Sequence, residues 1–170
     1  GLGKMGLSHL SILGAHPEVH VKGVCDSSRF VRSALSKYSN FPVFSDYAKM
    51  LSSQKFDGIV IAVPTKLHKE FVLKAIEKNI NVFCEKPFAL EYSDALEMQK
   101  AADDKSLVTQ VGYHNRFIGT FRAAKKILDE GRIGKIYHIV GEAHGPVVIN
   151  PKSGTWRSNP AEGGGCLLDY

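Results

Sequence analysis

The sequence predicts an α/β fold: a Rossmann-type, doubly wound parallel sheet, followed by the start of a second domain. Short apolar runs alternate with segments of helical periodicity along most of the chain. The chain opens on Gly1-Leu2-Gly3-Lys4-Met5-Gly6, which fits the pattern G-x-G-x-x-G. A later apolar run stops at Glu85-Lys86-Pro87, as expected for a buried strand whose carboxyl end faces a ligand. Together these three observations indicate a dinucleotide-binding domain.

The order of the elements follows from the hydrophobic pattern. A phosphate-binding glycine loop has to follow a strand, so we expect the first strand of the sheet to lie in a segment before Gly1. After Gly6, leucines recur at helical spacing until His16-Pro17. The expected strands that follow are 19–25, 42–44, 56–63, 81–84 and 107–111, and the expected helices are 27–38, 47–51, 66–78 and 92–103.

The alternation of strands and helices ends near residue 117. A helix is expected over 121–128 and a strand over 136–143, and a loop rich in Gly, Pro, Ser and Asn runs over 145–165. We therefore assign 1–117 to a Rossmann domain lacking its first strand. Residues 118–170 are expected to be the incomplete beginning of a C-terminal substrate and oligomerisation domain.

Composition narrows the class of protein. With 170 residues, of which 44% are hydrophobic, the chain can bury a core. The net charge of +5 comes from scattered lysines and arginines without interleaved aromatics, so we expect no nucleic-acid partner. No apolar stretch approaches the roughly 18 residues of a membrane span and no signal peptide is recognisable, so we expect a soluble, cytoplasmic protein with no membrane partner. Cys25, Cys84 and Cys166 are expected to be reduced, and we predict no metal site.

Each glycine of the opening motif has a physical role. Gly1 allows a tight turn, Gly3 lets the backbone approach a pyrophosphate, and Gly6 lets the helix pack closely on the strand. The amino end of the helix then offers N–H donors and a positive dipole end to phosphate. Glycine turns without a function are the alternative.

Asp26 is predicted to read the adenosine ribose. It ends the expected strand 19–25, twenty positions after Gly6, where an acid accepts hydrogen bonds from the ribose hydroxyls. Because its charge repels a 2′-phosphate, NAD is favoured as cofactor, while the nearby Arg29 keeps NADP possible. The alternative is that Asp26 is a turn or helix-capping residue before Ser27-Ser28.

Lys86 is the predicted catalytic residue. Oxidation of a carbinol requires a group within hydrogen-bond reach of the hydroxyl that loses its proton. Lys86 would lie at the carboxyl end of strand 81–84, where it could bind and polarise that oxygen. The alternative is a polar residue that only terminates the strand.

These residues lie in segments that resemble the Gfo/Idh/MocA family of nicotinamide oxidoreductases, which includes glucose-fructose oxidoreductase and inositol dehydrogenase. The similarity spans the chain, and the matching segments are residues 1–6, Val63-Pro64-Thr65 with His68, Cys84-Glu85-Lys86-Pro87, Asn115-Arg116-Phe117 and Gly163-Gly164-Gly165-Cys166-Leu167-Leu168-Asp169.

The resemblance implies roles for several residues. Lys86 would orient the substrate and handle its proton, and Asp169 matches a family acid that is followed four positions later by a histidine, here beyond Tyr170. That histidine is the alternative base, so the identity of the base stays open. The resemblance also implies a C-terminal α+β domain with an open, mainly antiparallel sheet that covers the substrate.

Further site residues are predicted from their places near the cleft. The predicted cofactor contacts are Gly1, Gly3, Lys4, Met5, Gly6, Asp26, Arg29, Pro64, Thr65, His68 and Glu85. The predicted substrate contacts are Arg116, Trp156 and Arg157. For His68 the alternative is a structural histidine, for Arg116 a solvated residue or interdomain salt bridge, and for Trp156 a buried loop anchor.

The function expected from these residues is hydride transfer between NAD, or NADP, and a hydroxyl carbon of a sugar, cyclitol or sugar nucleotide. One alternative is a reaction without net redox change, such as glycoside cleavage, in which the cofactor is recycled. Another is a non-catalytic NAD-binding module, which would need the glycines and Asp26 but neither Lys86 nor Asp169. We expect the whole protein to be a dimer or tetramer and the 170-residue chain alone to be inactive.

Overall fold

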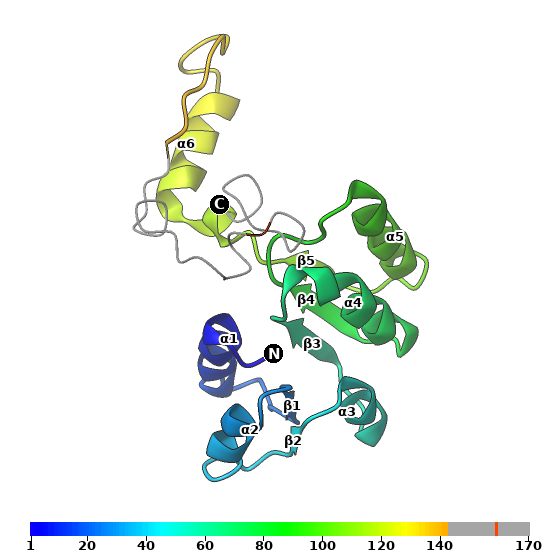
Figure 1. Cartoon of the computed structure of the whole chain (residues 1–170). Coiled ribbons are helices and arrows are strands. Elements are labelled where there is room, and N and C mark those ends of the chain that lie inside the picture. Colours follow the sequence, from blue (N-terminus) through cyan, green and yellow to red (C-terminus); the bar gives the residue numbers. More distant parts are fainter. Residues whose placement is uncertain (143–158, 160–170) are drawn as a thin grey trace. The chain divides into compact units, whose positions relative to one another are not determined.

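The computed structural model describes residues 1–142 and Asn159. The chain divides into two compact units, Gly1–Gly112 and Tyr113–Tyr170 (Figure 1). The division falls a few residues before position 117, where the sequence pattern changes. Predicted site residues Trp156, Arg157 and Asp169 lie outside the described residues, as does Cys166.

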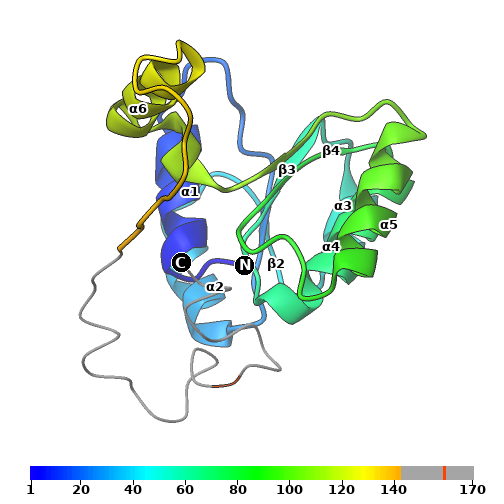
Figure 2. The same cartoon turned by 90° about the horizontal axis from the view of Figure 1, so that it is seen from above.

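The first unit consists of parallel strands with helices on both sides. Its strands are β1 (Val24–Cys25), β2 (Val43–Phe44), β3 (Gly58–Ile61), β4 (Asn81–Cys84) and β5 (Thr109–Val111). Its helices are α1 (Lys4–Gly14), α2 (Arg29–Leu35), α3 (Tyr47–Ser53), α4 (His68–Glu77) and α5 (Tyr92–Asp103), with a 3₁₀ turn η1 (Thr65–Leu67) before α4. Figure 2 shows α1 and α2 on one side of the strands and α3, α4 and α5 on the other. This arrangement confirms the predicted Rossmann-type α/β fold.

The strands form two parallel sheets. In one, β1 pairs with β2, and in the other the order is β3-β4-β5. Ile61 lies opposite Cys84, and Cys84 lies opposite Val111. The carboxyl ends of β3, β4 and β5 therefore meet at one edge, where ligands bind in open α/β sheets.

A single amide side chain links the opposite, amino-terminal edge of the larger sheet. Asn81 begins β4, and its Nδ2 donates to the carbonyl oxygen of Asp57 at 2.7 Å. Its Oδ1 accepts from the backbone N–H of Val108 at 2.9 Å. Asn81 thereby connects the segments that lead into all three strands.

The hydrophobic core lies around the larger sheet. The side chains of the buried cluster all come from residues 47–102, including Val72, Ala75 and Ile76 of α4 and Met98 of α5. Full burial of an aliphatic side chain of this size contributes about 1.5–3 kcal/mol. We infer that this half of the unit supplies most of its apolar stabilisation.

A cavity of about 720 Å³ separates the two sheets. It is lined by residues of α1, β1 and β3, among them Leu10, Val24 and Ile59. In the described part of the chain, β1 pairs only with β2, and β3 only with β4. The sides of β1 and β3 that line the cavity therefore lack a strand partner.

The cavity accounts for the main difference from the predicted strands. The strand expected over 19–25 is limited to Val24–Cys25, because residues 19–23 line the cavity without a ladder to join. The strand expected over 56–63 is likewise reduced to Gly58–Ile61. The other predicted elements of this unit occur with ends shifted by a few residues, and the helix expected over 92–103 coincides with α5.

The second unit begins with a 3₁₀ turn η2 (His114–Phe117) and helix α6 (Gly119–Asp129). Ion pairs one turn apart, Lys125 with Asp129 and Lys126 with Glu130, lie along α6. The strand expected over 136–143 is wrong for residues 136–142, which form no strand. Tyr137 and Ile139 are exposed there, and no neighbouring strand of the described chain offers them a ladder.

Candidate cofactor and active site

The glycine loop lies against the carboxyl end of β3. A Cβ atom on Gly1 would come within 2.5 Å of the carbonyl oxygen of Ala62. A Cβ atom on Gly6 would come within 1.9 Å of the carbonyl oxygen of Gly1. Real Cβ atoms do not approach backbone this closely, so both positions require glycine to let the loop, helix and strand pack together.

Gly3 differs from the other two glycines. No atom lies within 4 Å of where its Cβ would be, so packing within the described chain does not require glycine there. Gly3 is the N-cap residue of α1, and no side chain caps the helix. The first N–H groups of α1 and the open side of Gly3 thus fit a pyrophosphate. Lys4 and Met5, also predicted contacts, are the exposed first residues of this helix.

Asp26 follows β1 and contacts the glycine loop directly. Its Oδ2 accepts from the backbone N–H of Leu2 at 2.5 Å, and its Oδ1 accepts from the N–H of Ser28 at 2.7 Å. A carboxylate has about four acceptor positions, so two remain for the ribose hydroxyls. Asp26 therefore also has the role that the alternative gave it, because its bond to Ser28 stabilises the turn before α2.

The arginine nearest to Asp26 is one that the sequence did not single out. Arg32 donates from Nη1 to the carbonyl oxygens of Asp26 and Ser27, at 2.8 and 2.6 Å. Arg29 is the exposed first residue of α2. It lies one helical turn before Arg32 and three positions after Asp26.

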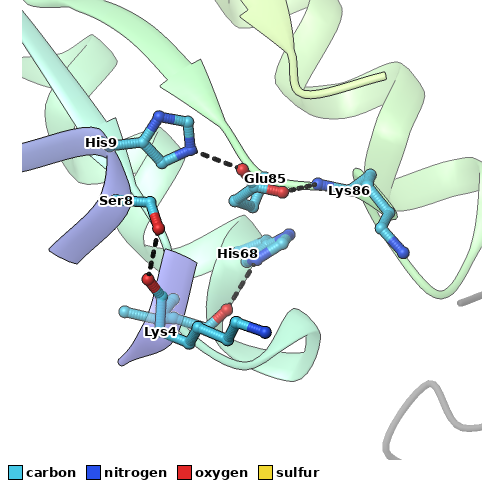
Figure 3. Close-up of polar contacts among 7 residues, drawn as sticks. Lys4, Ser8, His9, His68, Glu85 and Lys86 are labelled. Carbon is cyan, nitrogen blue, oxygen red and sulfur yellow. Dashed lines mark hydrogen bonds and ion pairs between the residues drawn. The ribbon is translucent and has the colours of Figure 1, made fainter. Parts of the chain in front are cut away.

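Glu85 and Lys86 follow β4 at the same edge of the sheet (Figure 3). Glu85 is 9% exposed, and its Oε2 accepts from the backbone N–H of Lys86 at 3.2 Å. Its other oxygen, Oε1, accepts from Nε2 of His9 on α1 at 2.6 Å. A Cβ atom on Gly112, after β5, would come within 3.2 Å of this carboxylate. Three segments therefore meet around Glu85.

His68 lies in the first turn of α4, as predicted, but the residue is only 1% exposed. Its Nδ1 lies 3.0 Å from the carbonyl oxygen of Pro87 and 3.2 Å from that of Phe88, and its Nε2 lies 2.9 Å from that of Val63. These contacts hold the segment after Lys86 against the segment after β3 and leave neither ring nitrogen open to a cofactor. The geometry therefore favours the structural alternative for His68.

The remaining predicted residues are placed as follows. Pro64 is exposed, and Thr65, which begins η1, is 7% exposed. Arg116 lies in η2 of the second unit and is exposed. The structure thus brings the glycine loop, Asp26, Thr65, Glu85 and Lys86 to one edge of the first unit, while Arg116 belongs to a separate body.

His9 and Arg32 were missed in the sequence. His9 stands among Leu7, Leu10 and Leu13 at helical spacing, and a polar residue on such a helix is a weak signal. Its partner Glu85 is 76 positions away, so the pairing is not visible in a local pattern.

Cys25 and Cys84 are free thiols, and burial raises the pKa of Cys84 to about 12, so this thiol stays protonated at neutral pH. Residues 1–142 and Asn159 contain no helix long and apolar enough to cross a membrane. The same residues contain no group of three or more His, Cys, Asp or Glu side chains that could hold a metal ion.

The fold and this edge of the sheet define a Rossmann-type dinucleotide-binding protein. Residues 1–113 match the family described as "Oxidoreductase family, NAD-binding Rossmann fold" (GFO_IDH_MocA), and residues 121–170 match the "GFO/IDH/MocA C-terminal domain". The chain therefore belongs to the Gfo/Idh/MocA family of oxidoreductases, which confirms the resemblance found in the sequence.

Curated relatives include both dehydrogenases and a hydratase. D-glucoside 3-dehydrogenase of Escherichia coli is 30% identical over 162 residues, which cover 95% of this chain and 46% of that protein. The 2,7-anhydro-N-acetylneuraminate hydratase of Mediterraneibacter gnavus is 34% identical over 128 residues, which cover 75% of this chain and 34% of that protein. The chain thus spans less than half the length of these relatives.

Solved structures that resemble this chain include an NAD-binding protein and a dehydrogenase. An NAD-binding protein from Listeria innocua superposes with a TM-score of 0.85 and 30% identity, covering all of this chain and 49% of that one. Scyllo-inositol dehydrogenase from Lactobacillus casei, solved with NAD(H) and scyllo-inositol, has a TM-score of 0.74 and 25% identity, covering 80% of this chain and 41% of that one.

Proposed function

We propose that the whole protein is an NAD-dependent dehydrogenase that oxidises a hydroxyl carbon of a sugar, a cyclitol or a sugar nucleotide. The observation that carries the proposal is the position of Lys86, directly after β4, at the edge of the sheet that also holds the glycine loop and Asp26. A protein that only bound NAD would need the loop and Asp26 but not this lysine.

The chain's own residues fit the two ends of the cofactor. Gly1 and Gly6 bring α1 close to the sheet, Gly3 leaves room for the pyrophosphate, and Asp26 keeps acceptor positions for the ribose. When bound, the nicotinamide would supply the hydride acceptor. Asp26 carries a charge that repels a 2′-phosphate, which supports NAD rather than NADP.

Lys86 is proposed to bind the hydroxyl oxygen that reacts. An ammonium group is a compact donor, and a donor aimed at this oxygen stabilises the negative charge that develops as the proton leaves. Asp169 is proposed to take part in the same site, and the identity of the base stays open. Residues 118–170 are proposed to begin the domain that covers the substrate.

A second function is favoured by one observation. The hydratase from Mediterraneibacter gnavus matches this chain as well as the dehydrogenase from Escherichia coli does. A hydratase causes no net oxidation, so a family member of this kind would use its NAD without releasing NADH. Sustained formation of NADH, followed by its absorbance with methyl glucoside and myo-inositol as test substrates, supports the dehydrogenase; turnover of substrate without NADH supports the second function.

The decisive variant is Lys86→Met in the whole protein. It keeps the length of the stem but removes the donor, so we expect kcat to fall by about 10²–10⁴-fold, the usual range for a positioned acid–base group. NAD affinity, measured by calorimetry, should change little.

The matched control is Lys78→Met, an exposed lysine at the carboxyl end of α4 and away from the site edge. It should leave both quantities unchanged. Full activity of Lys86→Met, with or without a loss of NAD affinity, would contradict the catalytic assignment, and a loss of the folded state would make Lys86 structural.

A further inference from the structure

His9 lies on the helix that follows the glycine loop, three residues after Gly6. Its Nε2 donates to Oε1 of Glu85 at 2.6 Å (Figure 3). The His9 and Glu85 side chains are 23% and 12% exposed, so water competes only weakly for this contact. The pair joins the predicted phosphate-binding helix to the residue directly before Lys86.

The ring of His9 has a second contact that fixes its position. It packs on Phe83 of β4 in an edge-to-face arrangement, with the ring centroids 5.1 Å apart. Because Phe83 lies within β4 and Glu85 directly follows that strand, they hold the same ring at two places. The histidine is therefore fixed relative to β4 and not only relative to its own helix.

Glu85 passes this constraint on to Lys86. One carboxylate oxygen is held by His9, and the other accepts from the backbone N–H of Lys86. Gly112 bounds the carboxylate on a further side, because a Cβ there would already crowd it at 3.2 Å. The carboxylate thus has little room to turn, and the start of the Lys86 segment is held with it.

We propose that His9 is a positioning residue for Lys86, acting through Glu85, so that the helix that holds the phosphates also sets the place of the catalytic lysine. This inference rests on the proposed role of Lys86. Its physical basis is that a reacting group displaced by about 1 Å can lose about 10²-fold in rate. His9 itself touches no reacting atom in this scheme.

The alternative is that the His9–Glu85 pair only stabilises the domain. A purely structural pair would lower the melting temperature and affect turnover only as far as the protein unfolds. A positioning residue lowers kcat in protein that remains folded, and its effect disappears once Lys86 is gone. These two behaviours can be separated by experiment.

The experiment compares His9→Leu with wild type in the whole protein, alone and combined with Lys86→Met. With methyl glucoside and myo-inositol as test substrates, we expect His9→Leu to lower kcat by about 10–100-fold. It should cause no further loss in the Lys86→Met background. His9→Gln places an amide donor near the position of Nε2 and should recover most of the activity. His16→Leu, an exposed histidine after α1, is the matched control and should behave as wild type.

A second readout needs no substrate. Acetic anhydride labels accessible lysines, and peptide mass spectrometry can follow the labelling of Lys86 in the folded protein. We expect His9→Leu to change the labelling rate of Lys86 severalfold and to leave that of Lys78 unchanged, whereas His9→Gln and His16→Leu should match wild type. If His9→Leu does not fold at the assay temperature, His9→Asn, whose shorter amide falls short of Glu85, replaces it in both measurements.

The outcomes distinguish this inference from the function on which it rests. If Lys86→Met keeps full activity, the proposed function fails. If Lys86→Met is impaired but His9→Leu matches wild type in turnover and labelling, the role of His9 fails alone. A loss from His9→Leu that is equally large in the Lys86→Met background would also overturn it, because His9 would then act independently of Lys86.

Discussion

The two sheets of the first unit differ in how they are supported. The β3-β4-β5 sheet is covered by α4 and α5, whose buried side chains form the hydrophobic core. The β1-β2 sheet has two residues per strand, and a cavity of about 720 Å³ separates it from the larger sheet. Lys86 belongs to the well-packed half, whereas Asp26 belongs to the weakly supported one.

This difference shows that the two ends of the predicted cofactor site are stabilised to different degrees by the surrounding structure. The lysine segment is held by core strands and by contacts from His9 and His68. Asp26 depends on a short ladder and on its own bonds to Leu2 and Ser28. Local opening draws on regions with few buried apolar contacts, so we expect the ribose end to open first.

The largest effect should come from filling the cavity. We propose to join about five valine and isoleucine residues before Gly1, which is the usual length and composition of a buried parallel strand. These residues would supply a strand between β1 and β3. We expect this extended chain to unfold cooperatively and to bind NAD at micromolar concentration, whereas the 170-residue chain does neither. Differential scanning calorimetry and NAD titration test both.

A matched extension of glycine and serine is the control for composition. It should behave like the 170-residue chain, because it offers backbone groups without apolar burial. If the unextended chain unfolds cooperatively and binds NAD at micromolar concentration, the β1-β2 half is not the weakly supported half of the unit.

The second effect tests the packed half. Ile76 is 2% exposed in the core, and Ile76→Ala in the extended chain should lower the free energy of unfolding by about 2–5 kcal/mol, the usual cost of such a cavity. Ile12, 68% exposed on α1, is the control, and Ile12→Ala should cost less than about 0.5 kcal/mol. Equal losses in urea denaturation would mean that the core does not dominate stability.

The third effect concerns cofactor choice at the weakly supported end. In the whole protein, Asp26→Ser should narrow the preference for NAD over NADP by about tenfold or more, because it removes a charge that repels the 2′-phosphate. Asp103→Ser, which changes an exposed acid at the carboxyl end of α5, should leave the ratio of the two affinities unchanged. A wild-type protein that already prefers NADP would show that Asp26 does not read the ribose.

The smallest effect compares two helix caps. Asp46 accepts from the N–H of Lys49 at 2.8 Å at the start of α3, whereas Ser28 accepts from that of Val31 at 3.4 Å at the start of α2. Asp46→Ala should therefore cost about 1 kcal/mol and Ser28→Ala about 0.5 kcal/mol or less. Chemical denaturation of the extended chain measures both losses in the free energy of unfolding. A larger loss for Ser28→Ala than for Asp46→Ala would contradict the expected order of the two caps.

The sequence predicted what depends on local pattern. Periodicity and strand ends predicted the α5 helix over 92–103, the succession of strands and helices along the chain, and the position of Lys86 after β4. The glycine spacing also predicted close packing at Gly6, where the structure leaves no room for a Cβ atom beside the carbonyl oxygen of Gly1.

The sequence could not predict strand lengths and contacts that depend on residues far apart in the chain. The strand over 19–25 is short because its length depends on a neighbour across the cavity, and the strand expected over 136–143 has no ladder in the described residues. The His9–Glu85 pair and the buried ring of His68 arise only when α1, α4 and the β4 end meet in space. Such contacts leave no periodic trace in a single sequence.

The amide of Asn81 has a consequence for how this scaffold can change. It joins the segments before β3, β4 and β5 at the edge of the sheet opposite to Lys86. Strand alignment is thereby secured at the edge opposite to the candidate site. Loops at the other end can lengthen, shorten or exchange side chains without shifting one strand past another. A sheet anchored in this way can acquire a new substrate preference through its loops and keep its geometry.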